Sequence, residues 1–189
     1  MGELEAPLGW VPLEGRGSLP FALVHGESLV AAASWALGEA GVVLFDASVT
    51  FDQVRDSGRT LVLHDPLCPL TPVDFLVEAV ARGEETGAVV AGFRPVTDTV
   101  KRADDDRLGE TVDRSDLRTV TSPVVVPPTV LVALDGLEAA DFAVLVAQLA
   151  ARSEVVWLEA PALSRRVRDE ADLRDLEALS RAAGAERDS

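Results

Sequence analysis

Asp65 is the residue whose position most clearly permits chemistry. It ends the run Thr60–Asp65, which has the aliphatic composition of a buried strand. Open α/β sheets bind ligands beyond the carboxyl ends of their strands, and a carboxylate placed there can hold a divalent metal beside a phosphate. The other interpretation is an ordinary turn aspartate after His64. Position alone leaves both interpretations open.

A glycine pair and an arginine cluster are candidates for binding an anion. Gly15 and Gly17 flank Arg16, but a single Gly-x-Gly is a weak phosphate-loop pattern, and beside Glu14 it also fits a shortened turn. A cluster of cations just before the last predicted helix either binds an anion or pairs with the acidic residues of 169–175. The cluster consists of Arg165, Arg166 and Arg168.

The two histidines and the single cysteine form no catalytic pattern of their own. His25 follows an apolar run in a predicted loop and His64 is a strand residue, so structural roles are favoured for both. Cys68 as a nucleophile would need a base, and only His64 is near it in sequence. We therefore favour a small residue in a β–α loop.

Charge and composition exclude several classes of protein. In 189 residues, 17 Lys and Arg stand against 32 Asp and Glu, and the net charge of −15 disfavours nucleic acid as a partner. The 48% hydrophobic content predicts a globular domain, which we place at residues 1–184 with a frayed tail at 185–189. No run reaches the roughly 18 apolar residues of a membrane span, and the start lacks the basic region of a secretion signal. We expect a cytoplasmic protein without membrane contacts.

Short apolar runs alternate with helical patterns, which predicts repeated β–α units around a mostly parallel sheet. The fold class expected is therefore α/β. The predicted strands are Gly41–Asp46, Thr60–Asp65, Ala88–Phe93 and Val155–Leu158, and the first three are expected to be buried between helix layers. The predicted helices are Ser28–Leu37, Thr71–Arg82, Ala140–Arg152 and Asp169–Gly184, with Thr71 as a cap and Gly184 as a stop.

The segment Thr97–Asp116 departs from this pattern. Two Thr/Val stretches flank a charged turn, which predicts a projecting β-hairpin too polar for the buried sheet. Asp104–Asp106 would form a solvated tip, a more common outcome than a cation site. Because such an arm buries little apolar surface alone, we expect a second subunit to cover it in a homodimer.

Several motifs resemble the methylerythritol-phosphate cytidylyltransferase family. They are Pro95–Arg102 (PVTDTVKR), Thr111–Arg114 (TVDR), Thr121–Pro123, and His64–Asp65 followed by Pro69–Leu70. The resemblance covers about Leu61 to Pro123 well and the remainder weakly. It implies a Rossmann-like nucleotidyltransferase fold whose hairpin, residues 95–116, is a dimerisation arm.

The resemblance also implies a reaction and roles for residues. The family joins CTP to methylerythritol phosphate, on Mg²⁺, with release of pyrophosphate. Asp65 would be the metal and ribose-side carboxylate, and Gly15 and Gly17 would contact the nucleotide. Thr99, Lys101 and Arg114 of the arm would bind the substrate phosphate in the neighbouring subunit's site. Arg16 and Arg166 would supply catalytic positive charge, Arg166 standing near the place of a family lysine.

Departures from the family pattern weaken the expected nucleotide site. The opening loop is shortened to Leu13–Phe21, with Glu14 in place of a small alanine and Phe21 in place of the catalytic lysine. Cys68 replaces a family arginine, and the run from Arg55 into Leu61 implies that a helix with nucleotide contacts is deleted. Each lost cation or donor costs on the order of 100-fold in rate.

We therefore interpret the sequence as a degenerate family member, a pseudoenzyme with impaired CTP binding and weak or absent transfer activity. One alternative is an active cytidylyltransferase in which Arg16, Arg166 and Mg²⁺ compensate. Another is a non-catalytic dimeric scaffold, or the partner of an active paralogue that receives Thr99 and Arg114.

Overall fold

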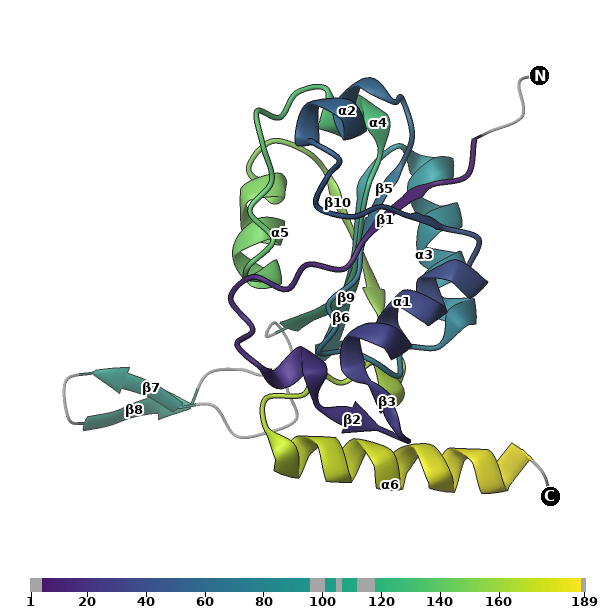
Figure 1. Cartoon of the computed structure of the whole chain (residues 1–189). Helices are drawn as coiled ribbons and strands as arrows, with labels where there is room; N and C mark the ends of the chain where they lie inside the picture. The colour runs from purple at the N-terminus through teal and green to yellow at the C-terminus, as the bar shows by residue number, and fades with distance from the viewer. Residues whose placement is uncertain (1–4, 96–100, 105–106, 112–117, 188–189) are drawn as a thin grey trace.

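Runs of β-branched and aliphatic residues form one six-stranded sheet at the centre of the molecule (Figure 1). The computed structural model describes residues 5–95, 101–104, 107–111 and 118–187. The strands of the sheet are β1 (Leu8–Trp10), β4 (Val43–Leu44), β5 (Leu61–Leu63), β6 (Val89–Pro95), β9 (Arg118–Val126) and β10 (Val155–Glu159). Their order is β10-β6-β9-β5-β1-β4. β9 is antiparallel to both neighbours and the other pairs are parallel, which confirms the predicted α/β fold.

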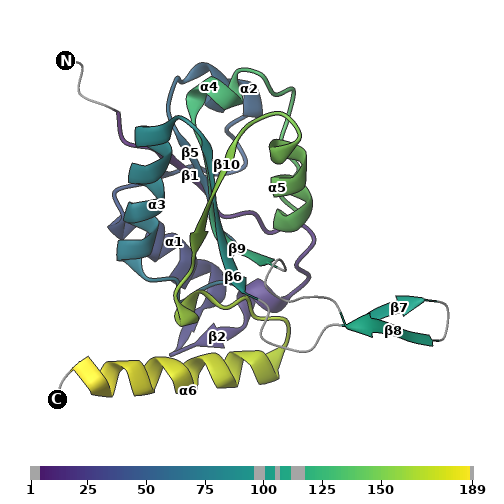
Figure 2. The same ribbon diagram turned by 180° about the vertical axis from the view of Figure 1, so that it is seen from behind.

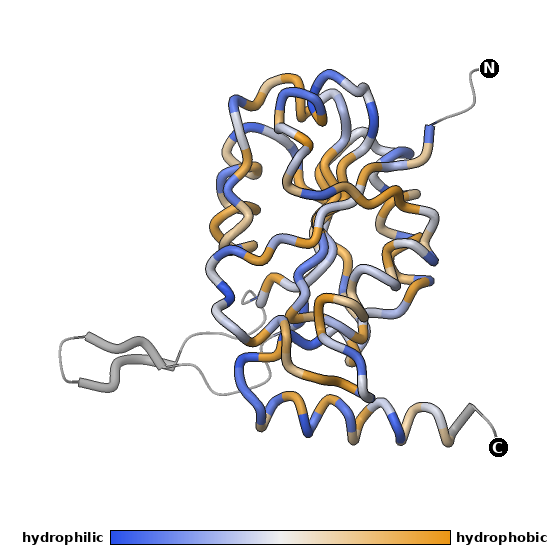
Figure 3. The backbone as a smooth tube through the Cα atoms, in the orientation of Figure 1, coloured by the Kyte–Doolittle hydropathy of each residue, from blue (hydrophilic) through white to orange (hydrophobic). Residues whose placement is uncertain are grey.

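Helices cover both faces of the sheet (Figure 2). On one face, α1 (Leu29–Glu39) and α3 (Val73–Thr86) pack on the alternate strand residues Val62, Val90 and Val125. The other face carries α2 (Phe51–Asp56), α4 (Pro128–Leu131) and α5 (Phe142–Ala150). Apolar residues therefore run through the middle of the molecule (Figure 3), as burial of two sheet faces requires.

The last helix, α6 (Glu170–Arg187), lies across one end of the sheet, beside the short hairpin of β2 (Leu23–Val24) and β3 (Glu27–Ser28) (Figure 1). Leu173 and Leu176 pack there with Val24, Leu67 and Val167 in a third apolar cluster. This cluster fixes the segment between β10 and α6 against the loop after β5. No helix in the described ranges is long and apolar enough to cross a membrane.

The helix starts follow from local capping. Ser28 accepts the Ala31 N–H at the start of α1, and Asp141 accepts two N–H groups at the start of α5. The predicted cap at Thr71 is wrong, because its hydroxyl donates to the Cys68 carbonyl (2.9 Å) and α3 begins after Pro72. The predicted stop at Gly184 is also wrong, because α6 continues to Arg187. Residues 185–187 of the expected frayed tail are therefore helical, and 188–189 lie outside the described residues.

One other expectation about the elements is corrected. The short helix α2 precedes Leu61 and begins with a capping box between Thr50 and Gln53, and the deletion of a family helix in the run from Arg55 into Leu61 stays a prediction. The run Gly41–Asp46 was expected to be buried, but β4 is the edge strand and its residues Val43 and Leu44 are exposed. A strand at the edge has one covered side only.

The predicted hairpin is present. β7 (Lys101–Asp104) pairs antiparallel with β8 (Arg107–Thr111), and the pair lies apart from the sheet and helices (Figure 1). Thr99 and Arg114, to which the resemblance gives substrate contacts, lie outside the described residues. Two short helical turns complete the chain, η1 (Leu19–Phe21) and η3 (Ala162–Ser164).

We expect a methyl group to have opposite effects on the free energy of unfolding at two glycines that lie in helices. A Cβ at Gly83 of α3 would lie 2.9 Å from Val125 Cγ1, whereas a Cβ at Gly38 of α1 would meet nothing within 4 Å. We expect Gly83→Ala to lower the free energy of unfolding by about 1 to 2 kcal/mol. Gly38→Ala should raise it by about 0.5 to 1 kcal/mol, because alanine is the better helix former. Urea unfolding followed by tryptophan fluorescence measures both, and equal effects would contradict the close packing of α3 on β9.

Candidate functional site

The site lies where β1 and β5 end, on the side of the sheet that α6 crosses (Figure 1). Asp65 follows β5 and Arg166 lies in the segment between η3 and α6. The Val167 N–H donates to the Leu67 carbonyl (2.7 Å), so this segment is fixed beside the residues after β5. Arg16 comes from the loop between β1 and η1. Three distant parts of the chain therefore meet at one carboxylate.

Asp65 is held between two guanidinium groups. Arg16 Nε donates to Oδ1 at 2.7 Å, and Arg166 Nε donates to Oδ2 at 2.9 Å. The Arg16 and Asp65 side chains are 0% and 2% exposed, whereas the Arg166 side chain is 37% exposed. The structure thus brings together three of the predicted site residues. Arg16 is the buried partner of Asp65, and Arg166 is the cation that solvent reaches.

The Arg16 guanidinium has further partners that hold it inward. It donates to the Glu14 carbonyl (2.6 Å) and to the Ala139 carbonyl (2.9 Å), and its central carbon lies 5.5 Å from the centre of the Phe142 ring. The turn that carries it needs glycine at Gly15 and Gly17, whose φ angles are 75° and 58°. Arg16 therefore joins the first loop to the start of α5.

The protonation states in the cluster follow from burial and charge. Burial alone would raise the pKa of the Asp65 carboxyl, but the two guanidinium groups lower it below its ordinary value, so Asp65 stays ionised. Burial raises the pKa of the Cys68 thiol and lowers that of His64 to about 4. Cys68 is thus a buried neutral thiol, as favoured from the sequence, and not an activated nucleophile.

The remaining arginines of the predicted cluster pair with a neighbouring acid. Arg165 Nη2 and Arg168 Nε both donate to Asp172, each at 2.7 Å. Of the two interpretations left open for this cluster, pairing with the acidic helix start therefore applies to these two residues. Arg166 differs, because its partner is Asp65, which lies 101 positions away.

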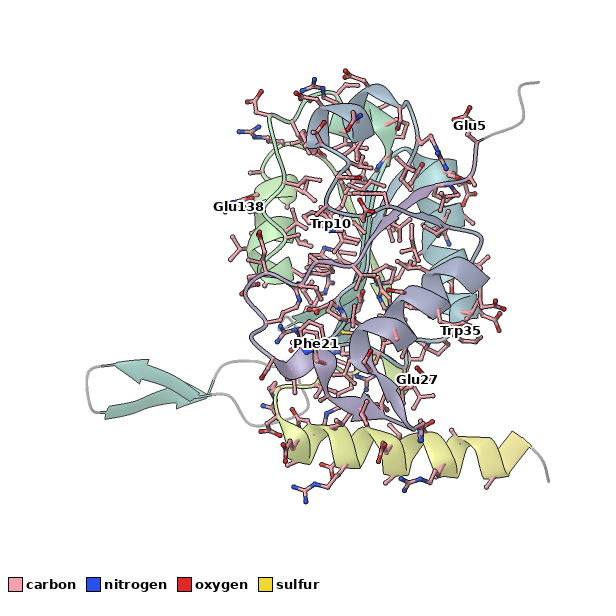
Figure 4. All side chains as sticks on the ribbon, viewed as in Figure 1. Glu5, Trp10, Phe21, Glu27, Trp35 and Glu138 are labelled. Carbon is pink, nitrogen blue, oxygen red and sulfur yellow. The ribbon has the colours of Figure 1, made fainter. Side chains whose placement is uncertain are left out.

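The other predicted site residues do not join this cluster. Phe21, which stands where the family has a lysine, is 60% exposed at the end of η1 (Figure 4), and the Glu14 side chain is exposed as well. Lys101 lies in β7 of the arm. The first loop therefore presents a carboxylate and an aromatic ring to solvent and keeps its one cation inside.

Sequence reasoning missed a cavity beside α2. A space of about 240 Å³ lies between α2 and the segment around Leu137, near the labelled Trp10 in Figure 4. The Trp10 and Phe45 rings stack there with centroids 6.4 Å apart. Nothing in the sequence pattern signals it, because its walls come from four separate segments. They are Trp10, Phe45–Ala47, Val49, Phe51, Val54, Leu61 and Leu137.

The described residues do not build a Mg²⁺ site by themselves. They contain no group of three or more His, Cys, Asp or Glu side chains that could hold a metal ion. Asp65 Oδ1 accepts from Arg16 Nε and the Leu67 N–H, and Oδ2 accepts from Arg166 Nε, so a metal would have to share Oδ2 with a guanidinium. The metal role of Asp65 therefore stays a prediction.

The molecule thus combines a mixed α/β sheet, an ionised carboxylate at the carboxyl ends of its strands and a separate hairpin. The structure is similar to 2-C-methyl-D-erythritol 4-phosphate cytidylyltransferase from Thermus thermophilus, with a TM-score of 0.68 and 21% identity over 95% of this chain and 100% of that one. The bifunctional IspDF from Campylobacter jejuni gives a TM-score of 0.61 at 13% identity, over 92% of this chain and 54% of that one. These likenesses concern the fold.

Sequence comparison establishes the family. The family model of 2-C-methyl-D-erythritol 4-phosphate cytidylyltransferase (IspD) matches residues 47–179, so the chain belongs to this family. The chain is 43% identical over 134 residues to the bifunctional enzyme IspD/IspF of Clavibacter michiganensis, covering 67% of this chain and 32% of that one. It is 39% identical over 70 residues to the Salinibacter ruber cytidylyltransferase, covering 37% and 29%. The chain thus spans about a third of the length of the curated relatives it matches.

The two arginines on Asp65 should differ in their effect on stability. Arg16→Met leaves a buried carboxylate with one cationic partner and removes a donor from two carbonyls, so we expect a loss of about 3 kcal/mol. Arg166→Met should cost about 1 kcal/mol, because its partly exposed pair is screened by water. Arg55→Met, which removes surface pairs with Asp52 and Asp56, is the matched control and should cost less than about 0.5 kcal/mol. Urea unfolding at pH 7 measures all three. Arg16→Met behaving like the control would contradict the buried clamp.

Asp172 should make the fold sensitive to acid. Its hydrogen bonds with Arg168, together with Arg165, lower its pKa from 3.8 to about 2 despite its burial. Because the folded pKa is the lower one, the pair stabilises the fold above about pH 4, and the contribution is lost as pH falls from about 4 towards 2. We expect Asp172→Asn to cost about 1 kcal/mol at pH 7 and much less near pH 2. Urea unfolding across this range, with Asp52→Asn as a surface control, measures the difference. A cost that does not change with pH would contradict the assignment.

Proposed function

We propose that this chain is a cytidylyltransferase-type protein in which CTP binding and transfer are weakened. The observation that carries the proposal is the 0% exposure of the Arg16 side chain. Arg16 is the one cation of the first loop, and its donors are used by Asp65, Glu14 and Ala139. A triphosphate at this loop would meet the exposed Glu14 and Phe21 side chains instead.

The energetics support impaired transfer. Phosphoryl and nucleotidyl transfer depend on positive charge held where negative charge develops, and each missing donor costs on the order of 100-fold. Turning Arg16 outward would leave Asp65 buried with a single cation, which is costly. An active enzyme would need Arg16 to turn towards the triphosphate in place of the lost cations, and this movement is therefore unfavourable.

What remains is a site for a phosphorylated ligand around Arg166. This side chain is partly exposed, and Arg16 and Arg166 together exceed the charge of Asp65 by one. By family membership the ligand is methylerythritol phosphate or CTP. The same proposal includes a homodimer through the arm, with Thr99, Lys101 and Arg114 reaching the neighbouring site. A dimer with an active paralogue that receives these residues is a variant of it.

An active cytidylyltransferase is the second candidate. It is favoured by the ionised Asp65 at the carboxyl ends of the strands, where the family reaction needs a carboxylate. It would require that Mg²⁺ bind Asp65 Oδ2 beside the Arg166 guanidinium. A scaffold without a ligand is the third candidate, and binding measurements separate it from the other two.

CTP binding discriminates between the first two candidates. At about 1 mM CTP with Mg²⁺, a Kd near 1 μM would add about 4 kcal/mol of stability and raise Tm by roughly 8 to 16 °C. We expect a rise below about 2 °C, which Arg166→Met abolishes and Arg55→Met leaves unchanged. Thermal shift measures the rise. A large rise would support the active enzyme, as would pyrophosphate release from CTP and methylerythritol phosphate by the chain alone.

A further inference from the structure

One buried hydroxyl joins β9 to the residues that follow β5. Ser122 Oγ accepts the Asp65 N–H at 2.9 Å and is hydrogen-bonded to His64 Nδ1. All three residues are buried, Ser122 and His64 completely. The Ser122 side chain therefore holds the backbone of Asp65 in place, while the arginines hold the Asp65 carboxylate.

The sheet geometry explains why a side chain is needed here. β5 and β9 pair from Leu61↔Val126 to Leu63↔Val124, and the pairing ends there. The His64 N–H donates to the Trp10 carbonyl of β1 (3.0 Å), so the next N–H of this segment that faces β9 is that of Asp65. The Asp65 N–H is buried beyond the last paired residues and needs an acceptor. Ser122 supplies it.

Hydrogen-bond accounting assigns the proton between Ser122 and His64. If the hydroxyl donates to Nδ1, the one group of this pair left without a partner among the described residues is His64 Nε2–H. If His64 donates instead, the hydroxyl proton and the Nε2 lone pair both lack a partner there. The first arrangement leaves fewer unsatisfied groups and is therefore favoured. His64 is then the Nε2–H tautomer, and it orients the hydroxyl so that a lone pair faces the Asp65 N–H.

We propose that Ser122 is a positioning residue, which together with His64 sets Asp65 between Arg16 and Arg166. β9 follows the arm in the chain and begins at Arg118, whose guanidinium carbon lies 5.0 Å from the Phe93 ring centre and 5.4 Å from that of Trp157. The strand that returns from the arm is thus fixed at its start by Arg118 and joined to Asp65 by Ser122. Any effect of this positioning on ligand binding rests on the proposed function, but the positioning of Asp65 by Ser122 does not.

Ser164 provides a matched control for loss of a buried hydroxyl. It is also completely buried, it lies two positions before Arg166, and its Oγ has no partner among the described residues. Ser164→Ala therefore removes the same atom near the same site without removing a contact to Asp65. An effect seen for Ser122→Ala and not for Ser164→Ala therefore reports loss of the contact to Asp65, and not loss of a buried hydroxyl in general.

The test uses NMR of the full chain at pH 7. In the unaltered protein, the Asp65 amide should be protected from hydrogen exchange, and His64 should show the Nε2–H tautomer. The chain has two histidines and His25 is exposed, so the two are readily distinguished.

Ser122→Ala should speed exchange of the Asp65 amide by about tenfold or more. It should also change the His64 ring-nitrogen shifts and shift or broaden the Nε–H signals of Arg16 and Arg166. Ser164→Ala should leave all of these unchanged.

Two results would overturn the proposal. One is an Asp65 amide that exchanges freely in the unaltered chain, which needs no variant. The other is a folded Ser122→Ala variant that matches Ser164→Ala in amide exchange, histidine shifts and arginine signals. If Ser122→Ala does not fold, Ser122→Cys takes its place in the same comparison. Titration with CTP and Mg²⁺, read at the Arg166 Nε–H, tests the proposed function separately, since failure to bind CTP leaves the Asp65 and His64 readouts intact.

Discussion

The ionised carboxylate of Asp65 must be neutralised where it is buried, and much of the site depends on this requirement. A buried charge is tolerated only with charged partners and saturated hydrogen bonds. Arg16 and Arg166 meet the requirement from opposite ends of the chain. Because Arg16 also bonds Ala139 and lies against Phe142, the same interaction fixes the first loop to the start of α5. Such a network specifies one arrangement of these segments more than it adds stability.

The same requirement opposes the chemistry that the family performs. A guanidinium that neutralises a buried carboxylate cannot at the same time stabilise charge on a triphosphate, and Arg16 has no exposed surface through which to do so. The positive charge of the cluster therefore neutralises Asp65 inside the protein. The whole chain carries a net charge of −15, and Glu14 is exposed at the loop itself, so long-range electrostatics also disfavour a polyanion. The proposed weakening of CTP binding is therefore compatible with retention of the fold.

Local pattern was sufficient for most elements of the fold and insufficient for the contacts of the site. Aliphatic runs and helical spacing placed the main strands and helices. β9 was not recognised, because Thr121–Pro123 interrupts its pattern with polar residues and a proline, and the resemblance alone marked it. Asp65 was identified from its place at the end of a predicted strand and Arg166 from its arginine cluster, and the resemblance gave both a role, but their pairing spans 101 positions and has no local signal. The inward direction of Arg16 depends on Ala139 and Phe142, and tertiary packing alone determines it.

The antiparallel direction of β9 explains why its start lies at the same end of the sheet as Asp65. The two neighbours of β9, β5 and β6, end at the edge of the sheet where ligands bind, so a strand antiparallel to them must begin at that edge. Pro95, the last residue of β6, pairs with Arg118, the first residue of β9, so the two strands that flank the arm in the chain meet at this edge. The first loop has no such constraint, since its position is set by Arg16 and not by the sheet. A lysine introduced at Phe21 would add a charge at the surface but leave Arg16 committed to Asp65, so restoration of a triphosphate site must replace the whole loop and the partner it gives to Asp65.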